Sequence, residues 1–122
     1  MTLRRLSVLQ WVGLLLGGIV WFAYHLAGYS LTEASCDSVG WDIHHDLWQI
    51  VGMVVAAAFV LAAQGAAIAV IRGTRGTSYE AEPPAARLRF VAIAAAAANV
   101  IFLMVILLDG LSAILNVACR QA

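Results

Sequence analysis

The chain has 122 residues, of which 63% are hydrophobic and 11% are charged, and its formal net charge is zero. This composition leaves too little polar chain for a soluble domain, and the seven basic residues are too few to form a nucleic-acid-binding surface. The composition therefore indicates a small integral membrane protein, with a single membrane domain over residues 1–122.

Three continuous apolar stretches follow one another along the chain, at about residues 6–29, 47–71 and 90–115. Each exceeds the roughly 20 residues that a helix needs to cross a hydrocarbon core of about 30 Å. A strand of a membrane barrel would alternate in polarity, whereas the stretch Val51–Leu61 is apolar throughout. Because lipid offers no hydrogen-bond partners, a spanning segment has to satisfy its own backbone. The predicted fold class is an all-α bundle of three transmembrane helices.

The basic residues predict the orientation of this bundle. Six of the seven flank the same side of the predicted spans: Arg4, Arg5, Arg72, Arg75, Arg87 and Arg89, against Arg120 alone on the other side. Positive residues favour the cytoplasmic side of a membrane. We therefore expect a cytoplasmic N-terminus and a cytoplasmic loop at 72–89. The loop at 30–46, which has no basic residue, and the C-terminus are then expected outside.

Both cysteines fall on the predicted outer side. Cys36 follows the first apolar stretch and Cys119 follows the third. Disulfides persist in oxidising compartments, so the sequence predicts a Cys36–Cys119 disulfide. On the chain-entropy account such a bond would stabilise the fold by about 4–5 kcal/mol. Two unpaired thiols and a metal-binding pair are the alternatives.

Four polar residues interrupt the apolar stretches in two pairs of similar depth. Gln64 and Asn99 lie roughly 12 and 15 Å from the cytoplasmic ends of their helices, which favours a hydrogen bond between the two amides. His25 and Asp109 both lie near the outer ends of their helices. Ionisable groups inside a span usually pair or face a cavity. We expect a His25–Asp109 pair that clamps two helices, with a proton or ion relay as the alternative.

Titratable residues also gather near the predicted outer surface. Imidazole, thiolate and carboxylate groups suit copper or zinc, and two histidines could hold haem. The candidate metal ligands His25, His44 and His45 are weak, because we favour surface histidines at the start of the second helix as the explanation of this group. We expect no cofactor. No arrangement of nucleophile and base indicates catalysis, so we do not expect an enzyme. The residues of this group are His25, Cys36, Asp37, Asp42, His44, His45 and Asp46.

Small residues mark the expected helix contacts. Gly13-x3-Gly17, Gly52-x3-Ala56 and the run Ala94–Ala98 would let helix backbones approach closely. In the connection at 72–89, Gly73 and Gly76 are expected to end the second helix, because glycine is typical of helix C-termini. Residues 85–89 are expected to complete the loop that leads into the third helix.

An ordered set of residues carries a family resemblance. The chain has Trp11-Val-Gly13, then Trp21, His25, Tyr29 and Cys36 in the spacing W-x9-W-x3-H-x3-Y-x6-C, then Arg87-x-Arg89-Phe90 and a terminal Cys119. This set resembles small three-helix bacterial membrane proteins that are found alongside cytochrome c oxidase components.

The resemblance implies a non-catalytic accessory subunit or assembly factor of a respiratory complex in the bacterial inner membrane, with other integral membrane subunits as partners. Two alternative functions stay open. One is a copper or haem carrier that uses the outer histidines. The other is a small oligomeric channel or transporter, for which Gln64, Asn99, His25 and Asp109 would supply polar groups.

Overall fold

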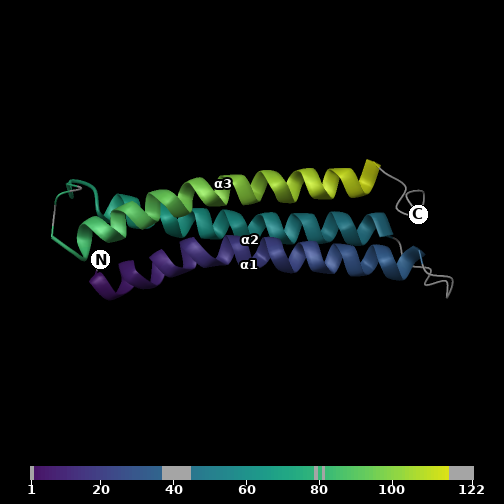
Figure 1. Ribbon diagram of the computed structural model, residues 1–122, viewed down its shortest axis with the longest axis horizontal. Helices are drawn as coiled ribbons and strands as arrows, with labels where there is room; N and C mark the ends of the chain where they lie inside the picture. Colours follow the sequence, from purple (N-terminus) through teal and green to yellow (C-terminus); the bar gives the residue numbers. More distant parts are fainter. Residues whose placement is uncertain (1, 37–44, 79, 81, 116–122) are drawn as a thin grey trace.

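Three long helices make up the fold. The structure is a computed structural model that describes residues 2–36, 45–78, 80 and 82–115, and the side chains of these residues except 35, 36, 45 and 46. Helix α1 spans Leu3–Cys36, α2 spans His45–Gly73 and α3 spans Ala85–Leu115. The three helices lie side by side in an elongated bundle, with α1 and α3 parallel to each other and α2 antiparallel to both (Figure 1). Each helix packs against the other two.

All three helices are long and apolar enough to cross a membrane. Only 22%, 33% and 22% of the most apolar part of α1, α2 and α3 is buried inside the bundle. In a soluble protein so much exposed apolar surface would be unfavourable, whereas a hydrocarbon environment accommodates it. The three helices therefore indicate a multi-pass membrane protein.

The helices extend beyond the apolar stretches from which they were predicted. Helix α1 continues to Cys36, through polar residues of the predicted loop at 30–46. Residues 85–89, also predicted as loop, form the first turn of α3, and the backbone N–H of Leu88 donates to the carbonyl of Pro84 at 3.0 Å. Hydropathy marks only the part of a helix that lies in hydrocarbon. The backbone hydrogen bonds of a helix do not have to end at the membrane surface.

Two clusters of buried side chains hold the bundle together. The first contains Leu6, Val70, Leu88 and Ala92, and it lies at the end where α1 and α3 begin. The second contains Tyr24, Ala56, Val60 and Ile106, and it lies toward the other end. Between them the helices meet through small residues, because Ala63, Ala67 and Ala95 are at most 1% exposed. Such residues permit the close backbone contacts on which membrane bundles depend.

Two of the predicted small-residue motifs lie at these contacts. A Cβ atom on Gly13 would lie only 3.1 Å from the backbone nitrogen of Ala67 on α2. A Cβ atom on Gly52 would lie 3.3 Å from the ring of Tyr24 on α1. Both distances are shorter than ordinary carbon contacts, so glycine brings α1 and α2 together at two levels.

The connection from α2 to α3 is fixed to both helices. Helix α2 ends at Gly73, and Gly76 has a φ of 91°, a left-handed conformation that suits glycine. The Thr74 hydroxyl donates to the carbonyl of Val70 at 2.8 Å, and Nη1 of Arg89 donates to the carbonyl of Thr74 at 3.0 Å. Arg89 thus caps the C-terminus of α2, where a positive charge also opposes the helix dipole.

Six arginines lie at the end of the bundle that holds the N-terminus and this connection, called the arginine end below (Figure 1). The structure brings the two arginine-rich segments together, since Leu6 of α1 packs with Val70 and Leu88.

Candidate functional site

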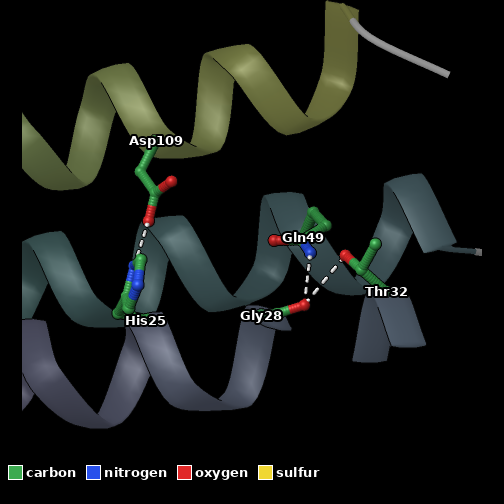
Figure 2. Close-up of polar contacts among 5 residues, drawn as sticks. All are labelled: His25, Gly28, Thr32, Gln49 and Asp109. Carbon is green, nitrogen blue, oxygen red and sulfur yellow. Dashed lines mark hydrogen bonds and ion pairs between the residues drawn. The ribbon is translucent and has the colours of Figure 1, made fainter. Parts of the chain in front are cut away.

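A group of polar side chains lies toward the end of the bundle opposite the arginines. Nδ1 of His25 on α1 lies 3.2 Å from Oδ2 of Asp109 on α3 (Figure 2). The parallel course of the two helices places these residues at the same level, although they are 84 positions apart in sequence. The side chains remain 54% and 42% exposed, so the contact lies on the outside of the bundle. It becomes an ion pair when the imidazole is protonated.

An aromatic stack supports the imidazole. The ring of Trp21 stacks on His25, one turn later on α1, with ring centroids 5.9 Å apart. The same indole also stacks on Phe102 of α3 at 5.9 Å. The buried Nε1 of Trp21 has no hydrogen-bond partner among the described residues. Trp21 therefore restrains the ring of His25 between α1 and α3 by packing.

A second polar contact joins α1 to α2 beside this pair. The carbonyl oxygen of Gly28 accepts one hydrogen bond from the Thr32 hydroxyl at 2.9 Å and another from Nε2 of Gln49 at 3.4 Å (Figure 2). Gln49 is only 4% exposed and is the residue through which α2 enters the group. Sequence reasoning did not select Gln49 or Thr32. An amide in the first turns of an otherwise apolar stretch was the available signal for Gln49.

These side chains line a small hollow of about 180 Å³. Its wall combines an imidazole, a carboxylate, an amide and hydroxyl groups. Pockets for small-molecule ligands usually measure about 300–1,000 Å³, so this hollow suits a few water molecules rather than haem or an organic substrate. The imidazole of His25 and the carboxylate of Asp109 can exchange protons with water held in this hollow. Its lining residues are Tyr24, His25, Gly28, Tyr29, Thr32, Gln49, Asp109 and Ala113.

The predicted hydrogen bond between Gln64 and Asn99 is not formed, so this expectation was wrong. Nδ2 of Asn99 donates instead to the backbone carbonyl of Gly13 at 2.8 Å. Both amide oxygens, Oε1 of Gln64 and Oδ1 of Asn99, are buried without a partner among the described residues. Glycines on α1 explain the outcome, because they expose a backbone carbonyl within reach of the short Asn99 side chain.

Several predicted site residues lie outside the described part of the chain. The structure describes neither the side chain of Cys36 nor residue 119, so the predicted Cys36–Cys119 disulfide lies outside the described residues. The same holds for His44 and for the side chain of His45, two of the weak metal-ligand candidates. Among the described residues, no three His, Cys, Asp or Glu side chains gather closely enough to hold a metal ion.

The chain was also compared with known proteins. No model of a protein family, no curated protein and no solved structure matches it.

Proposed function

We propose that this protein is a non-catalytic accessory subunit or assembly factor of a larger membrane complex, with other integral membrane subunits as its partners. The main supporting observation is the outward face of α2. Ala58, Ala62 and Gly65 are exposed, and their spacing of four and three residues places them on one face of the helix. A Cβ atom on Gly65 would meet nothing within 4 Å. Small residues on a membrane helix are the surface on which another helix packs closely.

The polar contacts of the described residues support the same proposal. Asn99 joins α1 to α3, Gln49 joins α1 to α2, and Arg89 caps α2. Each of these hydrogen bonds holds the bundle together. A scaffold of this kind presents fixed outer surfaces, which is what a structural subunit contributes to a complex.

We further propose that the complex is respiratory and of the cytochrome oxidase type, in the bacterial inner membrane. This part rests on the ordered tryptophan, histidine, tyrosine and cysteine pattern. Three members of that pattern point out of the bundle: Trp11 is 53% exposed, the His25 side chain 54% and Tyr29 63%. Outward-facing residues of this kind suit contacts with a neighbouring subunit.

The test is affinity purification of the tagged protein from its native membranes in mild detergent, followed by identification of the proteins that accompany it. We expect a defined set of membrane subunits with the wild type. The variants Ala62→Leu and Gly65→Leu should lose them, because a larger side chain holds a second helix away while the bundle itself has room for it.

Ala97→Leu is the matched control, since Ala97 is also an exposed alanine but belongs to α3 rather than to α2. It should retain the partners. Purification of the wild type without companions, or equal loss in all three variants, would count against the proposal. If a partner is found that belongs to no respiratory complex, only the oxidase assignment is overturned.

The proposed orientation has the arginine end in the cytoplasm, as positively charged flanks favour. Reporter fusions at each terminus would test it. A reporter that is active in the cytoplasm should work at the N-terminus and fail at the C-terminus, and the reverse pattern would show the opposite orientation.

A further inference from the structure

A groove of about 530 Å³ runs between the first turns of α1 and α3 at the arginine end. We propose that it binds one anionic phospholipid, with the phosphate at the arginines and the upper part of an acyl chain along the apolar floor. Arg4 and Arg87 line the groove from its two sides, and Gln10, Trp11, Leu14 and Val91 lie further along it.

The mouth of the groove is strongly positive. Arg4 and Arg87 are exposed, and the ion pair found among the described residues, His25–Asp109, lies at the opposite end of the bundle. Glu80 and Glu82 of the connection are exposed and form no ion pair with either arginine. Because α1 and α3 are parallel and both begin here, the positive ends of two helix dipoles add to the charge (Figure 1).

A buried amide points to a polar ligand deeper in the groove. Gln10 is only 7% exposed and lines the groove, yet no described residue forms a hydrogen bond with its side chain. The buried side-chain atoms without a partner among the described residues do not include the Gln10 amide, so this amide reaches the groove and can bind a polar ligand there. Gln10 lies six residues from Arg4, roughly 9 Å along the helix. That separation suits a phospholipid, whose ester carbonyls follow its phosphate toward the hydrocarbon.

The remainder of the groove is apolar. Leu14 and Val91 are half-buried beside the exposed ring of Trp11. Tryptophan is common at the membrane interface, where one part of the ring contacts acyl chains. A soluble phosphate ion would use the arginines alone and leave this floor empty. The continuity from charged mouth to buried amide to apolar floor matches an anionic lipid.

Native mass spectrometry of the purified full-length protein can test the proposal. The probes are phosphatidylglycerol and phosphatidylcholine with identical acyl chains, each added to the protein in detergent. We expect one phosphatidylglycerol per chain at concentrations where phosphatidylcholine does not bind. Excess inorganic phosphate should not displace the bound lipid. Equal binding of the two lipids by the wild type, or displacement by phosphate, would overturn the proposal without any substitution.

Two double variants locate the site. Removal of both groove arginines in Arg4→Gln/Arg87→Gln should weaken phosphatidylglycerol binding about tenfold. The control Arg72→Gln/Arg75→Gln removes the same charge from exposed positions outside the groove, and its binding should change by no more than about twofold. Gln10→Leu should weaken binding while circular dichroism shows an intact helical fold. Equal losses in the two double variants would indicate general attraction by charge and contradict a defined site.

Discussion

The side-chain amide of Asn99 on α3 donates a 2.8 Å hydrogen bond to the backbone carbonyl of Gly13 on α1. Asn99 is 1% exposed, so this bond lies inside the bundle. One turn further along α1, a Cβ atom on Gly17 would overlap Oδ1 of Asn99. The two glycines therefore act together: Gly13 supplies an acceptor, and Gly17 leaves the space that the amide occupies.

Replacing the two buried amides should change stability in opposite directions. Asn99→Leu loses the bond to Gly13 and should destabilise the bundle by about 0.6–2 kcal/mol. Gln64→Leu removes a buried oxygen that has no partner among the described residues, and it should be neutral or stabilising by up to about 1 kcal/mol. Thermal or denaturant unfolding in detergent micelles measures both. Destabilisation by Gln64→Leu as large as that by Asn99→Leu would contradict this difference.

Two neighbouring glycines offer a matched comparison. A Cβ atom on Gly17 would overlap Oδ1 of Asn99, whereas one on Gly18 would lie 3.4 Å from the nearest atom of Phe102. Gly17→Ala should therefore destabilise the bundle by about 1–3 kcal/mol, and Gly18→Ala by less than about 0.5 kcal/mol. The same unfolding assay applies. Similar effects of the two changes would show that Asn99 does not require the space at Gly17.

Gly110 makes room for a methionine between α2 and α3. A Cβ atom there would overlap Sδ of Met53 and would lie 3.0 Å from the Tyr24 hydroxyl oxygen. Gly110→Ala should cost about 1–3 kcal/mol. The double variant Gly110→Ala/Met53→Ala should cost less than the sum of the two single changes, because the shortened side chain relieves the overlap. Additive losses would mean that the two positions do not compete for space.

The His25–Asp109 contact is expected to contribute modestly to stability. Both side chains are about half exposed, and exposed pairs typically contribute about 0.2–1 kcal/mol. A double-mutant cycle with His25→Gln and Asp109→Asn should yield a coupling energy in that range. The same cycle can be measured on protein purified within its native complex. A coupling energy well above that range would then mean that a partner subunit covers the pair.

The predicted disulfide between Cys36 and Cys119 can be tested directly. Helices α1 and α3 run parallel, so their C-terminal ends lie at the same end of the bundle (Figure 1). We expect Cys36 and Cys119 to form an intramolecular disulfide. Alkylation of natively purified protein followed by intact mass analysis should find no reactive thiol until a reductant is added. Two alkylated cysteines without reductant would rule out the disulfide.

Polar residues within the spans were predictable as individual positions, but only one of the two pairings expected from equal depth is present. Equal depth suggested both Gln64 with Asn99 and His25 with Asp109. In the structure His25 lies 3.2 Å from Asp109, whereas Asn99 turns to Gly13. Depth along a helix can be read from sequence. The rotation of a helix about its own axis cannot be read when the helix is apolar on every side, because no amphipathic face marks the direction of its neighbours.

The sequence by itself determined three helices long enough to cross a membrane and the concentration of arginine at one side, because both depend on composition along the chain. Only the tertiary structure decided which small residues meet a neighbour and which face outward. Gly13, Gly17 and Gly110 border other helices, while Gly65 meets nothing within 4 Å. The groove between Arg4 and Arg87 likewise exists only because α1 and α3 pack in parallel. Arg4 and Arg87, on its two sides, are 83 positions apart in sequence, and packing alone brings them together.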